Sequence, residues 1–114
     1  MQPEQLKDLI LATLEDNKGI DITDIDISEL TDIANYFVIC SATSTRHAKT
    51  LADKVVEASK NNQVRPFGIE GEEDCEWVLI DLSDVVVHIM LPKTREFYSL
   101  EKLWTVTEAT RSKA

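Results

Sequence analysis

Aspartates are the side chains of this sequence that come nearest to a metal-binding pattern. Five of them lie in two β-rich stretches, Asp21, Asp24 and Asp26 in the first and Asp81 and Asp84 in the second. Carboxylates gathered in this way could hold two divalent cations. Their spacing is not specific to such a site, and carboxylates at alternate strand positions usually form a solvated face. We therefore favour a solvated acidic face over a two-metal centre.

Cysteine and histidine supply few ligands for a transition metal. The chain holds Cys40, His47, Cys75 and His88, scattered without the paired close spacing of structural zinc sites. Cys40 lies in an apolar run and Cys75 lies among acids, so we expect a core thiol and a loop thiol and not a disulfide. Both suit a reducing compartment. We predict no metal and no cofactor.

A hydroxyl-rich segment before a predicted helix could be arranged as a nucleophilic site. Ser41, Ser44 and His47, with an aspartate, would supply its groups. The same segment is more simply a helix cap, because Ser and Thr side chains satisfy free N–H groups of a first helical turn. The three glycines are too few and too scattered for a phosphate-binding loop or a dinucleotide fingerprint. We predict no catalytic residue.

Aromatic side chains are more informative as binding groups. Trp77 opens a predicted strand behind an acidic loop, and Tyr98 lies one residue off the apolar stripe of the last predicted helix. Strand alternation would aim Leu79 and Asp81 to the same side as Trp77. The result would be a mixed patch of aromatic, aliphatic and acidic groups, which suits binding to a protein. Core packing is an equally good interpretation of Trp77.

His88 lies in the strand predicted over residues 85–91. Alternation places it on the face of Val86 and Met90, opposite Val85, Val87 and Ile89. A buried core position and an interface position are both open for this side chain.

Length and charge limit the function further. A chain of 114 residues predicts one domain, residues 1–104, followed by a polar tail over residues 105–114. The net charge of −9 means that phosphate neutralisation cannot supply most of any binding energy. We expect a basic partner and little direct nucleic acid binding. No apolar run approaches the roughly 20 residues of a membrane span and no basic leader is present, so we expect a cytoplasmic protein.

The hydrophobic pattern predicts helices and strands in a mixed order. We expect helices over residues 3–18, 44–61 and 94–104, and strands over residues 20–27, 36–42, 64–69, 77–82 and 85–91. The first strand should contain a bulge or begin late, Ser83 and Asp84 should turn a hairpin, and Thr94 could cap the last helix. The strand–helix–strand order of residues 36–69 predicts a right-handed crossover between parallel strands. The fold class is α/β, a mixed sheet flanked by helices.

Four sequence blocks carry a resemblance to a known family. They read Tyr36-Phe-Val-Ile-Cys-Ser-Ala-Thr-Ser-Thr-Arg-His, Ile69-Glu-Gly, Trp77-Val-Leu-Ile-Asp-Leu-Ser-Asp-Val-Val-Val-His-Ile-Met and Arg95-Glu-Phe-Tyr-Ser-Leu-Glu-Lys-Leu-Trp. In this order they resemble the ribosomal silencing factors, also called the Iojap family, over nearly the whole chain. The resemblance implies a nucleotidyltransferase-like fold without the catalytic Gly-Ser pair and metal-binding aspartates of active relatives. No Gly-Ser dipeptide occurs in this chain.

The resemblance also implies a function and a set of site residues. A member would be a non-enzymatic factor that binds the large ribosomal subunit through ribosomal protein L-fourteen, blocks joining of the small subunit and represses translation when nutrients are scarce. The family's recurrent residues fall here on Glu70, Trp77, Asp81, Asp84, His88, Arg95, Tyr98, Leu100, Glu101 and Trp104. The residues we expect to bind the partner are Glu70, Trp77, Asp81, His88, Met90, Arg95 and Tyr98.

Two positions depart from the family pattern, and two other functions stay open. Asn35 stands where the family usually has Asp, and Ser83 stands where it usually has Gly. If the hairpin turn needs a positive φ at Ser83, serine there costs about 1 kcal/mol relative to glycine. The strand aspartates would also suit a nucleotide-handling enzyme, although fold analogy is weak support for one. Apolar strand edges and aromatics in a small domain would suit a homodimeric scaffold.

Overall fold

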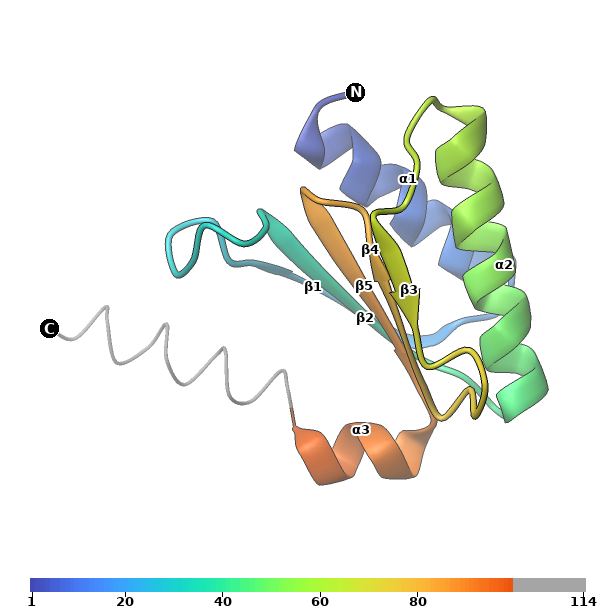
Figure 1. Cartoon of the computed structure of the whole chain (residues 1–114). Coiled ribbons are helices and arrows are strands. Elements are labelled where there is room, and N and C mark those ends of the chain that lie inside the picture. The colour runs from blue at the N-terminus through green and yellow to red at the C-terminus, as the bar shows by residue number, and fades with distance from the viewer. Residues whose placement is uncertain (100–114) are drawn as a thin grey trace, which may run out of the picture.

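Eight elements make up residues 1–99, the part of the chain that the computed structural model describes (Figure 1). They are α1 (Pro3–Asp16), β1 (Ile20–Asp26), β2 (Tyr36–Ser41), α2 (Thr45–Asn61), β3 (Gly68–Glu70), β4 (Trp77–Asp81), β5 (Val85–Met90) and α3 (Pro92–Tyr98). The predicted α/β fold class is confirmed. The predicted tail, and the site candidates Leu100, Glu101 and Trp104, lie outside the described residues.

The five strands form one mixed sheet in the order β1-β2-β5-β4-β3. Strands β2 and β5 run parallel, whereas β1 pairs with β2, β4 with β5 and β3 with β4 in antiparallel fashion. The predicted crossover therefore joins two strands of the same direction, β2 and β3, but β5 and β4 lie between them. The predicted bulge in β1 is confirmed by a register shift between Ile20 and Thr23.

Strand β3 is much shorter than predicted. The expected strand over residues 64–69 is reduced to Gly68–Glu70. Val64 is held at the C-terminal end of α2, because its N–H donates to the Ser59 carbonyl at 2.8 Å, and Gln63 before it has a left-handed φ of 68°. Pro66 has no N–H to donate to a neighbouring strand. Pairing begins only at Phe67, whose N–H donates to the Asp81 carbonyl.

The start of α3 also differs from the prediction. Thr94 does not cap this helix, because the N-cap is Leu91 and Pro92 occupies the first turn. Proline is suited to that position, since its fixed φ is helical and its missing N–H would have been unpaired there. Phe97, the neighbour of Tyr98 in this helix, is 80% exposed. The helix therefore carries aromatic groups on the surface of the described region.

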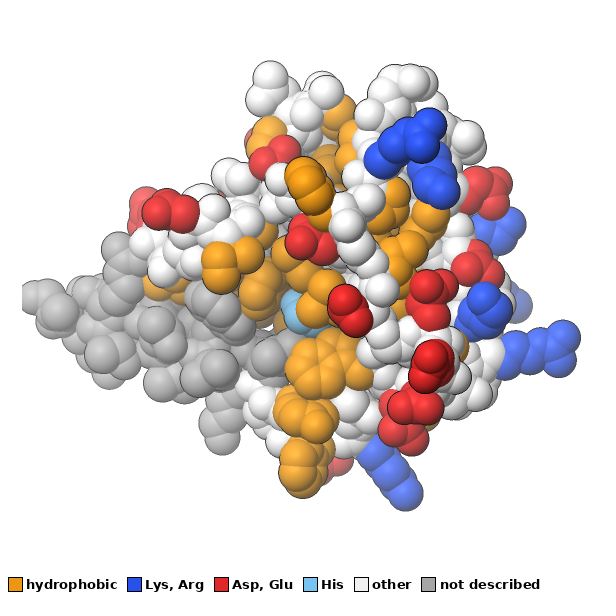
Figure 2. Space-filling view, viewed as in Figure 1, with side chains coloured by type: hydrophobic (Ala, Val, Ile, Leu, Met, Phe, Trp, Pro, Cys, Tyr) orange, Lys and Arg blue, Asp and Glu red, His pale blue; other side chains and the backbone are white. Residues whose placement is uncertain are grey.

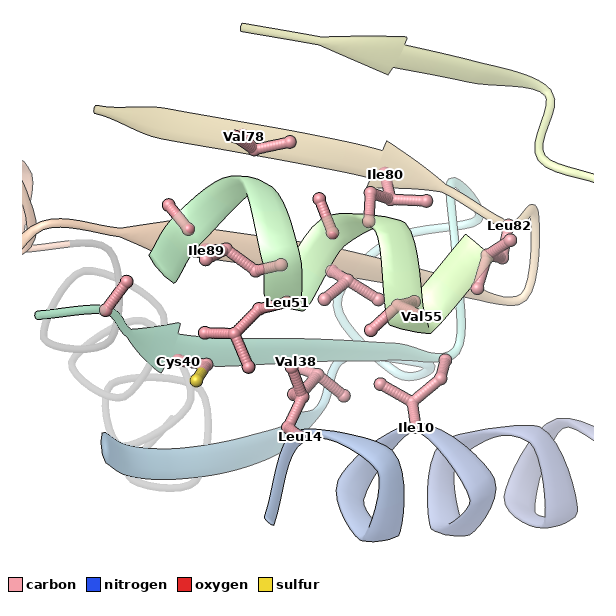
Figure 3. Packing of buried hydrophobic residues seen from close by; sticks show 14 of the residues in the cluster. Ile10, Leu14, Val38, Cys40, Leu51, Val55, Val78, Ile80, Leu82 and Ile89 are labelled. Atoms are coloured by element: carbon pink, nitrogen blue, oxygen red, sulfur yellow. The ribbon is translucent and has the colours of Figure 1, made fainter. Parts of the chain in front are cut away.

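Helices α1 and α2 cover one face of the sheet and bury the main core (Figures 1 and 3). The apolar spacing of each helix puts one stripe toward the strands, and Ser44 caps α2 by accepting the His47 N–H. Figure 3 shows the labelled helix side chains directed at alternate strand residues. Its large, fully buried side chains include Ile10, Leu14, Val38, Leu51, Val55, Val78, Ile80 and Ile89.

Both cysteines are buried and free, as expected for unpaired thiols. Cys40 is in this core, and burial raises the pKa of its thiol to about 11. A thiol so rarely ionised is a weak nucleophile. Cys75 lies in the loop before β4, yet it too packs against the core.

Ser83, in the hairpin turn, has a backbone conformation that costs a serine more free energy than a glycine. Ser83 has φ 72°, the left-handed region, and its N–H donates to the Asp81 carboxylate at 2.8 Å.

Replacing Ser83 with glycine should therefore raise the free energy of unfolding by about 0.5–1 kcal/mol. Urea denaturation would measure it. Ser83→Ala is the matched control, because alanine keeps the Cβ and should bring no gain; equal stabilisation by both variants would contradict this explanation.

Candidate functional site

Five of the seven predicted binding residues lie on the sheet face opposite α1 and α2, which we call the second face. Residues that pair across neighbouring strands point to the same side of a sheet. Glu70, Trp77, Asp81, His88 and Met90 are brought together in this way by the register of β3, β4 and β5. Across the sheet the second face has three rows: Ser41, Met90 and Trp77; Thr23, Ile39, His88, Leu79 and Glu70; and Ile25, Phe37, Val86 and Asp81.

The other two predicted residues reach this face from α3, which lies beyond the ends of the strands (Figure 1). The Arg95 guanidinium donates to Ser41 Oγ at 2.8 Å and to Thr23 Oγ1 at 3.3 Å. The Tyr98 ring packs on the Trp77 ring, with centroids 4.7 Å apart and planes at 50°. Arg95 thus anchors α3 to β1 and β2, and all seven predicted residues belong to the second face or to the helix packed against it. Two of them are not accessible there, because Met90 is 0% and His88 4% exposed.

An aromatic run crosses the second face from its interior to its exposed end. Phe37 contacts His88 with ring centroids 4.9 Å apart, and Trp77 bridges His88 and Tyr98. Phe97 meets Tyr98 edge-on at 5.0 Å. Trp77 is half-buried, whereas Tyr98 is 53% exposed, so the run ends in accessible aromatic surface. Figure 2 shows a histidine ring inside a hydrophobic patch that acidic side chains border.

His88 is a buried member of this run. Of the two interpretations of its position, the buried one is therefore correct. It is only 4% exposed, and burial lowers its pKa to about 4, so the ring is neutral at pH 7. Its Nδ1 accepts the Trp77 indole N–H at 3.1 Å. The ring proton therefore resides on Nε2, which is buried and has no hydrogen-bond partner among the described residues.

Acidic groups border the aromatic run on the side of β3 and β4. Glu70 is exposed and lies opposite Leu79. Asp81 is half-buried, and its carboxylate accepts the Ser83 N–H, so it holds the hairpin turn as well as adding charge. Four further exposed acids precede Trp77 in the loop: Glu72, Glu73, Asp74 and Glu76. The predicted mixed patch of aromatic, aliphatic and acidic groups is confirmed.

Gly71 fixes how this acidic loop enters β4. Its φ is 85°, and a Cβ there would collide with the Trp77 carbonyl oxygen. The loop closes with a hydrogen bond from the Cys75 N–H to the Gly71 carbonyl at 2.9 Å. Only glycine allows this close approach. The backbone of Trp77 is thus positioned by its own preceding loop.

Sequence reasoning did not assign to this site the residues that support it from β1 and β2, although it considered Ser41 for a nucleophilic one. Phe37 extends the aromatic run, and Thr23 and Ser41 receive the Arg95 guanidinium. Their types carry no functional signal by themselves. They join the site because β2 lies beside β5 and because α3 folds back over the strand ends, and neither fact can be deduced from spacing.

The groups considered for catalysis serve structural purposes. Ser44 caps α2, and the His47 ring binds the Thr43 N–H through Nδ1 at 3.0 Å and approaches the Asn17 carbonyl through Nε2 at 3.0 Å. The predicted capping segment is confirmed. Asp26 accepts two hydrogen bonds from Ser28, and these lower the pKa of its carboxyl.

Within residues 1–99, no group of three or more His, Cys, Asp or Glu side chains is placed to hold a metal ion. In the same residues, no helix has both the length and the apolar character that crossing a bilayer demands.

Several known proteins similar to this chain are ribosomal silencing factors. The family model described as "Ribosomal silencing factor during starvation" matches residues 1–114. A ribosomal silencing factor of Chromobacterium violaceum is 41% identical over 91% of this chain and 85% of its own length, and one of Haemophilus influenzae is 36% identical over 87% and 97%. The mouse protein named "Mitochondrial assembly of ribosomal large subunit protein 1" is 38% identical over 87% of this chain and 45% of its own length.

Solved structures agree with the fold. A crystal structure of a Chromobacterium violaceum protein, 41% identical, matches with a TM-score of 0.90 over 92% of this chain and 88% of its own. A structure from Bacillus halodurans, 30% identical, matches with a TM-score of 0.81 over 89% and 94%. The nucleotidyltransferase-like relationship stays a prediction.

Burial of His88 predicts that stability depends on pH. An unfolded histidine has a pKa near 6.5, and the folded value is about 4. As pH falls below 6.5 the unfolded chain takes up a proton that the folded chain does not, so stability is full above pH 6.5 and is lost toward pH 4. We expect a loss of about 2 kcal/mol between pH 7 and pH 5 from this group, measurable by urea denaturation. In a His88→Asn variant most of this loss should disappear; an undiminished loss would assign it to other groups.

Proposed function

The chain belongs to the ribosomal silencing factor family, and from that premise we propose that it represses translation by binding the large ribosomal subunit with the second face of its sheet. One observation carries the proposal: the seven residues expected to bind the partner, from three strands and a helix, gather on the second face, where an aromatic run meets an acidic border. Five of them are at least partly accessible, and the buried Met90 and His88 support them from beneath. Aromatic groups of this kind, half-buried and ending in exposed rings, are typical anchors of protein interfaces.

The partner we propose is ribosomal protein L-fourteen. A factor with net charge −9 is repelled by RNA phosphates but is attracted to a basic protein surface. The exposed acids beside Trp77 would steer such a partner toward the aromatic run. Complementary charge of this kind contributes mainly to the rate and orientation of association, while the buried aromatic contacts set the lifetime of the complex.

The proposed mechanism is steric and does not require turnover. A protein bound to the joining surface of the large subunit excludes the small subunit from the same space. Occupancy alone determines the effect, so a catalytic centre has no part in it. This agrees with the structural use of Ser44 and His47 in capping α2 and with the low nucleophilicity of the buried Cys40 thiol.

The direct test is binding to separated ribosomal subunits. The purified chain should co-sediment with the large subunit and not with the small one, and it should suppress subunit joining at a fixed magnesium concentration. Purified L-fourteen should compete for the chain in the same assay. Binding to neither subunit by a folded sample would refute the proposal, and binding that L-fourteen does not displace would refute the choice of partner.

Trp77 and Tyr98 should be the main energetic anchors. Trp77→Ala and Tyr98→Ala should each weaken binding to the large subunit by about 2 kcal/mol, roughly thirtyfold, as truncated aromatic hot spots do. Equilibrium binding with labelled subunits would measure this. Phe67→Ala is the matched control, because Phe67 is an 80% exposed aromatic outside the aromatic run. Unchanged affinity in both folded variants would remove these residues as anchors.

Association should slow as salt is added. If the acidic border steers docking, raising the salt from about 0.05 to about 0.3 M should lower the association rate several-fold and change the dissociation rate little. Glu70→Gln should lower the low-salt rate. Glu15→Gln removes the same charge from exposed surface of α1, the helix on the other side of the sheet, and should have less effect. An association rate that does not change with salt concentration, or equal effects of the two variants on it, would contradict electrostatic steering.

A further inference from the structure

His88 raises a question that packing alone does not answer. It lies on the second face between the aliphatic side chains Ile39 and Leu79 in its row and against the Phe37 ring. An apolar residue could occupy such a position without an unpaired polar atom. The imidazole instead leaves its Nε2–H buried without an acceptor in the described part of the chain. Buried polar groups in native proteins are nearly always paired, so an exception calls for a reason.

The other nitrogen of the ring supplies that reason. An indole N–H can only donate, and Trp77 Nε1 lies 3.1 Å from His88 Nδ1. A neutral imidazole with its proton on Nε2 presents a lone pair at Nδ1. The two rings are also in tilted contact, with centroids 6.0 Å apart. His88 therefore accepts one hydrogen bond, from the indole of Trp77, the half-buried ring at the centre of the run.

We infer that His88 is a positioning residue for the partner-binding surface: through Nδ1 it holds the Trp77 indole in the orientation that packs on Tyr98 and is presented to the partner. This inference rests on the proposed function of the second face and adds the part played by its most buried polar group. His88 itself does not touch the partner in this account.

Orientation matters because the second side-chain torsion of tryptophan is broad and has two main wells. Without an acceptor at the sheet, the half-buried indole could turn its N–H toward water and move off the Tyr98 ring. Ordering it again on binding would weaken the complex, since immobilising a side chain opposes association. A ring fixed in advance avoids that loss. Because His88 Nδ1 must accept this hydrogen bond, the ring proton lies on Nε2, and that buried N–H is left unpaired.

Three variants separate positioning from packing. His88→Asn keeps an acceptor, because its Oδ1 occupies roughly the place of Nδ1. His88→Leu is similar in size but has no acceptor. Trp77→Phe keeps an aromatic ring and removes the N–H, leaving His88 intact. If His88→Leu fails to fold, the comparison of Trp77→Phe with wild type still tests the hydrogen bond.

The indole N–H resonance reports the hydrogen bond in the absence of any partner. In a proton–nitrogen NMR spectrum, Trp77→Phe identifies the resonance of Trp77. His88→Leu should shift this resonance upfield and speed its exchange with water, and His88→Asn should restore slow exchange. A resonance that His88→Leu leaves in place, with unchanged exchange, would overturn the inference whatever the partner is.

Binding to the large subunit tests the consequence. His88→Leu and Trp77→Phe should each weaken affinity about tenfold, and His88→Asn should stay within about threefold of wild type. In the double variant His88→Leu/Trp77→Phe the loss should match that of either single variant, because both remove the same interaction. Additive losses, or wild-type affinity in Trp77→Phe, would contradict a role through the indole.

The two proposals fail in different ways. If wild-type protein does not bind the large subunit, the proposed function is wrong, and the NMR measurement still decides whether His88 orients Trp77. If wild type binds but the double variant loses affinity additively, the function stands and the positioning role is wrong.

Discussion

Strand β5 must fit two different surroundings at once, and the rest of the structure depends on how it does so. All six of its residues are buried, and it lies at the centre of the sheet with β2 on one side and β4 on the other. Val85, Val87 and Ile89 enter the core beneath α1 and α2. His88 and Met90 point to the second face. A one-residue slip in register would exchange the two sets and put a histidine into the aliphatic core.

This division explains why the second face can be both apolar and ordered. The first face supplies hydrophobic stabilisation through close packing with two helices, and the second face can then carry groups whose placement serves recognition. Trp77, His88 and Tyr98 are held by ring contacts and a hydrogen bond, while the Arg95 guanidinium ties α3 to β1 and β2. A surface supported in this way loses little conformational freedom on binding.

Charge and aromatic groups have separate parts in the proposed complex. The excess of acids favours approach to a basic protein and disfavours nucleic acid, but surface charges are screened within about 8–10 Å at physiological salt. Short-range affinity must therefore come mainly from the aromatic run. A repressor that acts by occupancy needs such a persistent contact and not a reactive group. The residues that looked most reactive, Ser44, His47 and Cys40, are accordingly used for capping and packing.

Local sequence determined much of this molecule. Hydrophobic spacing predicted α1, α2 and the β4–β5 hairpin, because side-chain direction repeats with the period of the element. Capping by Ser44 and the bulge in β1 follow from short-range rules and are confirmed. The sequence left open whether Ser83 has a positive φ, and the structure shows that it does. Strand alternation correctly put Trp77, Leu79 and Asp81 on one side. The family blocks pointed to the residues that gather on the second face.

Only the tertiary structure decided which strands are neighbours and how deep each side chain lies. Spacing shows which way a residue points, but pairing depends on contacts between segments far apart in the chain, so the insertion of β5 and β4 between β2 and β3 could not be deduced. The same holds for His88, whose alternation fitted core and interface equally well. Its burial, its neutral ring and its bond to Trp77 arise from neighbours that β2, β4 and α3 supply, because a pKa and a hydrogen bond depend on three-dimensional surroundings.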